Sequence, residues 1–174
     1  KDKGDLDAAI DSYKQALKIK PDCADTYYNM GNSLKDKGHL EAAIDSYKQA
    51  LKIKPDSADT SYNMGNALKD KGDLEAAIDS YKQALKINPD FAEVYYNMGN
   101  ALKDKGDFES SIDSYTEALK IKPDYAEAYN NMGVALKDKG DLEVAIGSFK
   151  LALKIKSDYA DAYNNMGAAL KDKG

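Results

Sequence analysis

Residues 35–68 read KDKGHLEAAIDSYKQALKIKPDSADTSYNMGNAL, and this stretch of 34 residues decides the fold. The next 34 residues, 69–102, differ from it at only six positions. Its opening letters KDKG recur at a constant step, at Lys1, Lys35, Lys69, Lys103, Lys137 and Lys171. A fixed period of roughly 20 to 50 residues is typical of a solenoid, in which each repeat stacks on its neighbours. Function is therefore expected on a surface rather than in an enclosed cleft.

Each period contains two helical patterns. The first runs from about Ala24 to Lys37, and the second, from about Leu40 to Ile53, carries an apolar stripe wide enough to contact two neighbours. A similar pattern covers about Asp5 to Ile19, and the first pattern returns at about Ala160 to Lys173. Glycines after a lysine-rich turn suit the left-handed residue that ends a helix, and these are Gly38, Gly72, Gly106 and Gly140.

Proline and aspartate mark the start of the next first-type helix. Proline stops the preceding helix, and the aspartates that follow are expected to be N-caps, at Asp22, Asp56, Asp90 and Asp124.

A second set of glycines lies inside the first-type helix, where each costs about 1 kcal/mol relative to alanine. We expect these glycines to allow close helix approach, with Gly31 facing the small side chain of Ala43.

Together these positions resemble the tetratricopeptide repeat family over essentially the whole chain. The resemblance rests on an aromatic residue, an apolar-glycine pair and a later apolar residue in the first helix, followed by alanine, an aromatic residue, alanine and proline. One set is Tyr27, Met30, Gly31, Leu34, Ala43, Tyr47, Ala50 and Pro55, and the departures elsewhere are Ser61, Ser111 and Ser157.

The resemblance implies an all-α, right-handed superhelical solenoid of antiparallel helix pairs with about ten helices. The expected array is a single domain, 1–174. Residues 1–21 would be the second helix of one repeat, 22–55, 56–89, 90–123 and 124–157 full repeats, and 158–174 the first helix of another. The resemblance also implies a non-catalytic module that binds an extended peptide or protein segment in a concave groove lined by the first-type helices.

Three rows of residues are candidates for this groove. The first is a row of asparagines, Asn29, Asn63, Asn97, Asn131 and Asn165. Beside it lie Asn32, Asn66 and Asn100, replaced by Val134 and Ala168. The third row is Tyr28, Tyr62 and Tyr96, replaced by Asn130 and Asn164. An amide can both donate to and accept from a peptide backbone. The alternative is that the asparagines brace neighbouring helices through inter-repeat hydrogen bonds, and that the tyrosines belong to the core.

The residues of these rows can be compared with the binding sites of known family members. Chaperone adaptors of the family hold a carboxylate with two lysines, an arginine and two asparagines, whereas this chain has Tyr62, Asp59 or Glu93 at clamp positions. This argues against a carboxylate clamp. The first row looks more like the substrate-recruiting superhelix of O-linked N-acetylglucosamine transferases, which makes a recruiting arm of a glycosyltransferase one alternative function.

Composition narrows the remaining functions. The chain has 25 basic and 30 acidic residues, and arginine is absent, so we expect no nucleic-acid partner. No apolar run is long enough to cross a bilayer, so we expect no membrane contact. His39 stands where other copies have aspartate, and Cys23 is expected to be a tolerated variant. No catalytic group, metal site or cofactor is predicted, and location stays open, with cytoplasm as the default.

A further alternative follows from the terminal segments. The chain is expected to be a fragment of a larger protein, natural or idealised, that starts with a second-type helix and ends with a first-type helix. These two segments are complementary, so copies could stack head to tail as a self-assembling scaffold.

Overall fold

The computed structural model describes residues 3–174, with side chains from Asp5 onward. Lys1 and Asp2, which open the first KDKG copy, lie outside the described residues. Residues 3–174 form ten α-helices and no strand, which confirms the predicted all-α class. The second-type helices are α1 (Lys3–Ile19), α3 (Leu40–Ile53), α5 (Leu74–Ile87), α7 (Phe108–Ile121) and α9 (Leu142–Ile155). The first-type helices are α2 (Ala24–Asp36), α4 (Ala58–Lys71), α6 (Ala92–Lys105), α8 (Ala126–Lys139) and α10 (Ala160–Lys173).

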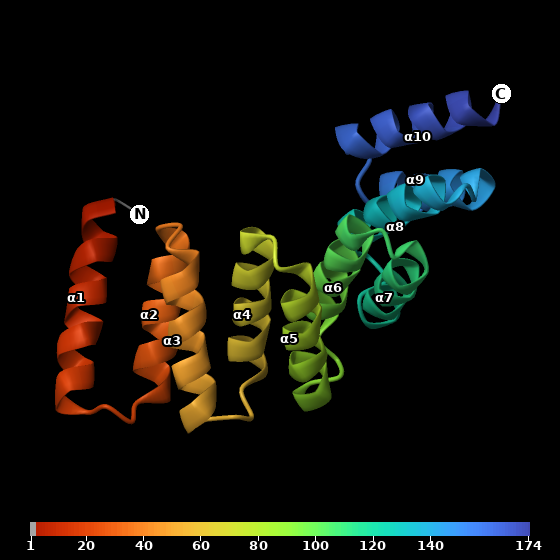
Figure 1. The fold of residues 1–174 in the computed structure, drawn as a ribbon. Coiled ribbons are helices and arrows are strands. Elements are labelled where there is room, and N and C mark those ends of the chain that lie inside the picture. The colour runs from red at the N-terminus through yellow and green to blue at the C-terminus, as the bar shows by residue number, and fades with distance from the viewer. Residues whose placement is uncertain (1–2) are drawn as a thin grey trace. The chain divides into compact units, whose positions relative to one another are not determined.

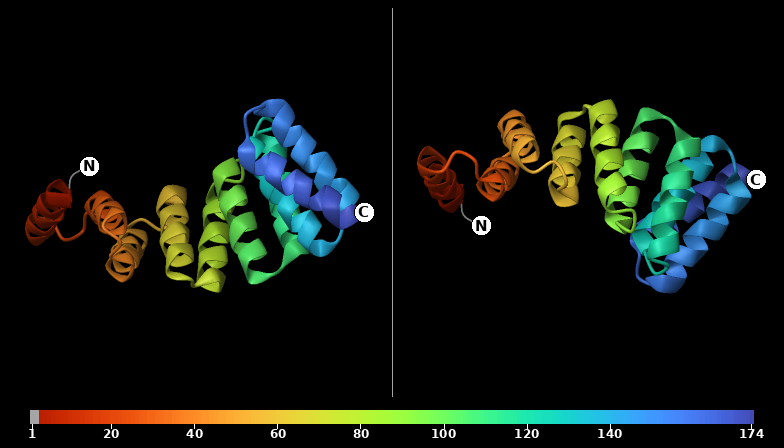
Figure 2. Two further views of the ribbon diagram at one scale, coloured as in Figure 1. Left: turned by 90° about the horizontal axis from the view of Figure 1, so that it is seen from above. Right: turned by 90° about the horizontal axis from the view of Figure 1, so that it is seen from below.

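The helices fall into two compact units, Lys1–Pro89 and Asp90–Gly174. In the first unit each of α1 to α4 packs on the next helix along the chain, and α2 also contacts α4 (Figures 1 and 2). In the second unit each of α6 to α9 packs on the next helix, and α8 contacts both α6 and α10. Contact between successive first-type helices is the arrangement of a solenoid of antiparallel helix pairs, as predicted.

The core of each repeat combines small residues with one large ring. In the first unit, Ala43 and Tyr47 of α3 are 0% exposed, and Ala77 and Tyr81 repeat this in α5. In the second unit the core around α9 contains Leu136, Ala145, Ile146, Phe149 and Ala169. Apolar side chains spaced three and four residues apart on the second-type helices therefore bury one continuous face, as the sequence pattern predicts.

Glycine ends the first-type helices as expected. Gly72 after α4 has φ 91° and Gly106 after α6 has φ 86°, both in the left-handed region that favours glycine. The two helices of a pair are therefore joined by a very short turn.

The expected N-cap aspartates are wrong by one residue. The N-caps of the first-type helices are Cys23, Ser57, Phe91, Tyr125 and Tyr159. The reason is visible at α8, where the Tyr125 amide donates to the Lys122 carbonyl at 3.3 Å and closes a turn over Pro123 and Asp124. The aspartate is thus used inside the turn. The side chain of Ser57 accepts a hydrogen bond from the Thr60 backbone amide.

The nearest neighbour of the internal glycines is a buried ring, which was not predicted from the sequence. A Cβ built on Gly31 would lie 2.6 Å from Cε1 of the Tyr47 ring, and Tyr47, not Ala43, provides the three nearest atoms. The absent side chain makes room for the buried ring of the following helix. The small residue of the following helix also lies close to the glycine, because in α7 the Ser111 hydroxyl donates to the Gly99 carbonyl at 2.8 Å.

Candidate functional site: the asparagine and tyrosine rows

The first asparagine row ties neighbouring first-type helices together. The amide nitrogen of Asn63 on α4 donates to the Tyr28 hydroxyl on α2 at 2.9 Å. In the second unit Asn131 on α8 donates to the Tyr96 hydroxyl on α6 at 3.0 Å. Asn165 on α10 donates to the Asn130 carbonyl oxygen at 3.0 Å. These are the inter-repeat hydrogen bonds of the bracing alternative.

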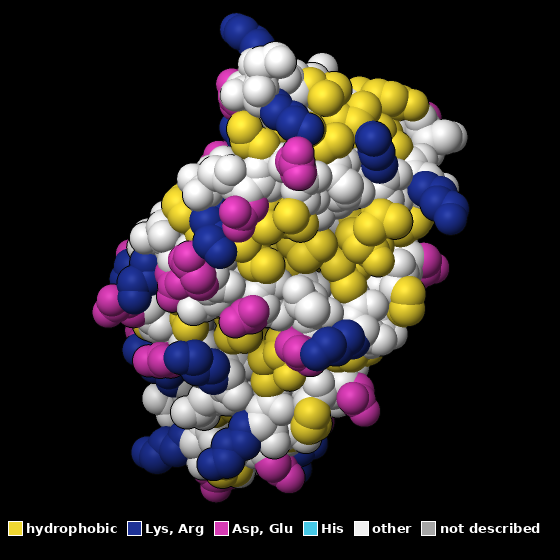
Figure 3. All heavy atoms as spheres, turned by 90° about the vertical axis from the view of Figure 1, so that its right-hand side faces the viewer, with side chains coloured by type: hydrophobic (Ala, Val, Ile, Leu, Met, Phe, Trp, Pro, Cys, Tyr) yellow, Lys and Arg dark blue, Asp and Glu magenta, His cyan; other side chains and the backbone are white. Residues whose placement is uncertain are grey.

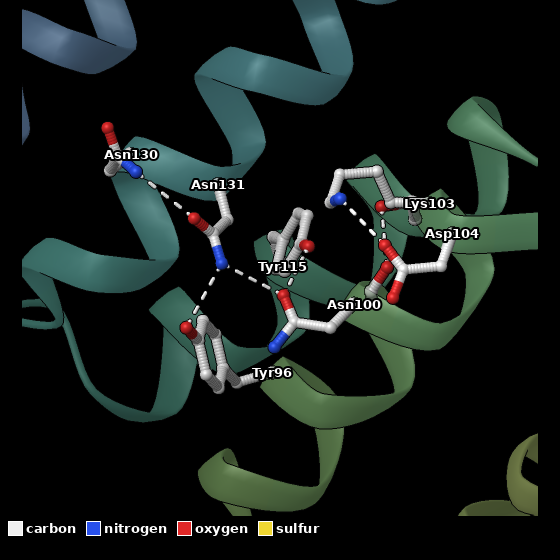
Figure 4. A network of polar contacts seen from close by, with 9 residues as sticks. Tyr96, Asn100, Lys103, Asp104, Tyr115, Asn130 and Asn131 are labelled. Carbon is white, nitrogen blue, oxygen red and sulfur yellow. Dashed lines mark hydrogen bonds and ion pairs between the residues drawn. The ribbon is translucent and has the colours of Figure 1, made fainter. Parts of the chain in front are cut away.

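Asn131 uses all of its polar atoms inside the molecule (Figure 4). Its nitrogen also donates to the Asn100 carbonyl oxygen at 2.9 Å, and its own oxygen accepts from Asn130 at 3.1 Å. Asn29 is different, because its side chain is exposed. The row therefore contains one side chain open to solvent and others that hold two repeats in register.

The second asparagine row has a separate partner, the buried tyrosine of the same helix pair. The Tyr47 hydroxyl donates to the Asn32 carbonyl oxygen at 2.7 Å, and the Tyr115 hydroxyl donates to that of Asn100 at 2.7 Å. Tyr81 and Asn66 form the same bond at 2.8 Å. Burial raises the pKa of these three tyrosines, so the hydroxyl stays a protonated donor.

One helix pair lacks both members of this bond. In α9 the buried ring is Phe149, which has no hydroxyl, and the facing position in α8 is Val134 instead of asparagine. Val134 packs against the apolar cluster that contains Phe149. A buried hydroxyl needs an acceptor, and a phenyl ring does not. The asparagine is therefore present where the tyrosine is present, and both change together.

The tyrosine row lies at the edge of the core and is half-buried. The Tyr28 ring lies 6.3 Å from the Tyr47 ring, and the Tyr96 ring lies 6.1 Å from that of Tyr115, both in tilted arrangements. The replacement at Asn130 keeps the hydrogen-bond acceptor for the next repeat, as described for Asn165. Tyrosine and asparagine can therefore exchange at this position without loss of the inter-repeat bond.

Some groups of these rows remain available to a ligand. Asn32 and Asn100 are half-buried, their oxygens accept from tyrosine, and their Nδ2 atoms have no hydrogen-bond partner within residues 5–174. Tyr28 also forms one wall of a hollow of about 160 Å³. Its other walls come from α2, α3 and α4 and include Asp25, Lys54 and Asp59.

The other candidate residues have local roles. Cys23 is the N-cap of α2, and its sulfur accepts from the Thr26 hydroxyl at 3.0 Å. His39 is the N-cap of α3. Within residues 5–174, no three His, Cys, Asp or Glu side chains are placed to share a metal ion. None of the described helices combines the length and the low charge that a transmembrane span requires.

The comparisons with known proteins agree with this architecture. The family profile for the TPR repeat matches residues 1–38, 31–72, 65–106, 99–140 and 135–174. The chain belongs to the tetratricopeptide repeat family. Members of this family are protein-interaction modules, and this chain is one of them. A comparison with proteins of curated function finds no match.

Solved structures of TPR proteins superimpose well on the chain. A crystal structure of MamA is 33% identical, with a TM-score of 0.86 over 91% of this chain and 92% of that one. Residues 41 to the end of MamA from Desulfovibrio magneticus RS-1 share 20% identity, with a TM-score of 0.84 over 90% and 89%. YrrB, described as a TPR protein with an unusual peptide-binding site, shares 24% identity, with a TM-score of 0.78 over 92% and 83%. The last two likenesses show the fold alone.

Proposed function

We propose that this chain is a non-catalytic module that binds an extended polypeptide segment along its first-type helices. The observation that carries the proposal is the state of Asn32 and Asn100. Each amide is oriented by a buried tyrosine, so its Nδ2 group is a fixed donor with no hydrogen-bond partner among the described side chains and backbone. A fixed donor can bind a main-chain carbonyl with little loss of side-chain entropy.

The two asparagine rows then have different tasks. The first row holds neighbouring repeats in register, and only Asn29 of that row is exposed. The second row donates to the ligand backbone. The hollow beside Tyr28 provides side-chain contact in the first unit, and its walls carry both charges, from Lys54 and from Asp25 and Asp59.

A polypeptide fits this surface better than a nucleic acid does. The chain carries a net charge of −5 and has no arginine, so it lacks the forked donor that binds phosphate with two hydrogen bonds. The single-domain array 1–174, the four full repeats from 22 to 157 and the groove assignment of Tyr62, Tyr96 and Asn66 are parts of this proposal. Asn97 belongs to the first row and is assigned to holding the repeats in register.

The test uses a substitution that the chain itself contains. In a variant with Asn32→Val and Tyr47→Phe, and the same pair at Asn100 and Tyr115, the helix pairs copy the natural Val134 and Phe149. The amide donors of Asn32 and Asn100 are removed together with the tyrosine hydroxyls that they accept from. Asn131 loses its bond to Asn100 and keeps its bond to the Tyr96 hydroxyl. We expect loss of capture from a displayed library of extended peptides, with the circular dichroism spectrum unchanged.

The matched controls separate the two rows. Asn29→Ala removes an exposed amide of the first row without breaking an inter-repeat bond, and capture should be retained. Alanine at all five positions of the first row should loosen the repeats and lower the melting temperature. Unchanged capture by the valine-phenylalanine variant would contradict the proposal.

A second candidate function is end-to-end association of copies, because the outer face of α10 is open. Leu170 is 50% exposed, whereas Leu136 at the same register is 6% exposed. A Cβ at Gly167 would meet no atom within 4 Å, whereas at Gly133 it would meet the Phe149 ring at 2.6 Å. Figure 3 shows hydrophobic side chains gathered on the side of the molecule where α9 and α10 lie.

The occupant that matches this face is α1 of a second copy. Tyr13 of α1 stands at the register of Tyr47, whose ring packs over Gly31. The ring of Tyr13 would therefore cover Gly167 of the other copy. Light scattering should show a mass that rises with concentration, and Leu170→Glu should abolish the rise, while Val144→Glu on the exposed side of α9 should not. A monomer at every concentration would refute this association.

A further inference from the structure

The hollow beside Tyr28 is bounded by a small residue where the second unit has a ring. Ser57, the N-cap of α4, forms one of its walls. The N-caps of α8 and α10 at the same register are Tyr125 and Tyr159. The backbone is similar at the two kinds of cap, with φ −99° and ψ 101° at Ser57 and φ −86° and ψ 84° at Tyr125. The repeats can therefore be compared position by position.

The second unit shows how a ring is held at this position. The centroid of the Tyr125 ring lies 4.8 Å from that of Tyr96, on the preceding first-type helix, and the two planes are tilted by 36°. The ammonium nitrogen of Lys122 lies 4.5 Å from the centroid of the Tyr125 ring. Lys156 lies over the Tyr159 ring in the same way, at 4.9 Å. At Tyr125 the ring is thus in contact with both a tyrosine and a lysine.

The first unit has the same two partners but no ring between them. Tyr28 and Lys54 stand two periods before Tyr96 and Lys122, and both form walls of the hollow. The Ser57 hydroxyl accepts from the Thr60 backbone amide at 3.3 Å, so this short side chain is held against α4. The volume of the hollow is about 160 Å³. A cavity of about 150 Å³ can hold one benzene molecule, so there is room for a single ring.

We propose that this hollow binds the single-ring side chain of a tyrosine or phenylalanine in a partner polypeptide. The ring would take the place that Tyr125 takes in the second unit, in contact with the Tyr28 ring and under the Lys54 ammonium group. That the ring belongs to an extended segment along the first-type helices rests on the function proposed above. The contacts of the ring itself do not depend on the asparagine donors.

The test follows backbone amide chemical shifts while capped Gly-Tyr-Gly tripeptide is added to the labelled chain 1–174. We expect saturable shifts at Tyr28 and Ser57 and a several-fold weaker response to capped Gly-Leu-Gly, which offers no ring face to a lysine. Tyr96 and Tyr125 serve as an internal control, because their site is already filled. Ser57→Tyr should abolish the shifts, whereas Ser57→Ala, which leaves the hollow open, should retain them.

The reverse exchange gives a matched gain of binding. Tyr125→Ser copies Ser57 in the second unit, so new saturable shifts should appear at Tyr96. The valine-phenylalanine variant separates this site from the proposed function, because it loses the amide donors and keeps the hollow. Its tripeptide shifts should persist while its capture of library peptides is lost. If the unmodified chain captures library peptides without tripeptide shifts, the ring site alone is wrong. Shifts without capture would support the ring site and contradict the groove function.

Three results would overturn the proposal, and none of them depends on whether a variant folds. The first is an absence of saturable shifts at Tyr28 and Ser57. The second is an equal response to the leucine peptide, which would indicate an unspecific apolar surface. The third is an equal response at Tyr96 and Tyr125 of the unmodified chain, where a ring already occupies the site.

Discussion

The internal glycines allow a direct test of how the repeats are packed. Gly99 and Gly167 occupy the same register in α6 and α10. A Cβ at Gly99 would lie 2.6 Å from Cε1 and 2.8 Å from Cδ1 of Tyr115, whose side chain is 0% exposed. A Cβ at Gly167 would meet nothing within 4 Å. The same substitution, glycine to alanine, should therefore have opposite effects at the two positions.

The magnitudes follow from two opposing contributions. Replacing a helix-interior glycine with alanine gains about 1 kcal/mol at either site. At Gly99 the ring of Tyr115 must move, and overpacking of a filled core costs about 1–3 kcal/mol. Movement of the ring also strains its 2.7 Å hydrogen bond to Asn100, whose loss costs about 0.5–1.5 kcal/mol. Gly167→Ala should therefore stabilise by about 1 kcal/mol, and Gly99→Ala should destabilise by about 0.5–3.5 kcal/mol.

Urea unfolding monitored by circular dichroism at 222 nm measures both changes against the unmodified chain. The expected order of midpoints is Gly167→Ala highest, the unmodified chain next and Gly99→Ala lowest. If Gly99→Ala is as stable as Gly167→Ala, the ring does not fill the space above the glycine, and the packing described here is wrong.

Two further predictions concern single contacts. Asn32→Val should lower the free energy of unfolding by about 1–3 kcal/mol, because it leaves the buried Tyr47 hydroxyl without an acceptor. Adding Tyr47→Phe should restore most of this loss, as measured by urea unfolding. Losses that add up in the double variant would contradict the pairing. The hydrogen bond from Lys37 holds the pKa of Asp7 below its ordinary value of 3.8, so the stability it contributes is present above that pH and is lost as the pH falls below it. The melting temperature should therefore fall less steeply between pH 5 and pH 2.5 for Asp7→Asn than for the unmodified chain. An equal fall in both would refute the contribution of this hydrogen bond.

Much of the fold could be predicted because the repeat shows the same local signals several times. The predicted second-type helix, Leu40 to Ile53, has the bounds of α3, and the glycine that ends α4 has the expected left-handed backbone. The N-caps were misplaced because proline followed by aspartate favours both a turn and a cap, and the turn uses the aspartate. Sequence spacing alone does not decide between these two uses.

The candidate site was less predictable because an asparagine can serve a ligand or the protein itself. The sequence did contain a signal that would have separated the two rows. Tyrosine at positions 47, 81 and 115 accompanies asparagine at 32, 66 and 100, whereas Phe149 accompanies Val134. Such paired replacement indicates a hydrogen bond between the two positions. The glycine partner could not be read in this way, because Ala43 and Tyr47 are both spaced to face Gly31.

The shared oxygen of Asn100 has a consequence for local opening of the chain. It accepts from Tyr115 on α7 and from Asn131 on α8, so one atom of α6 links three helices. Separation of α8 from the α6–α7 pair breaks the bonds that Asn131 donates to Asn100 and Tyr96. By contrast, a single side-chain hydrogen bond among the described residues, from Asn165 to Asn130, joins α10 to α8, and Leu170 of α10 is half exposed. Protection against hydrogen exchange should therefore be weakest in α10 and rise sharply at α8, so that unfolding of the second unit begins at one defined end.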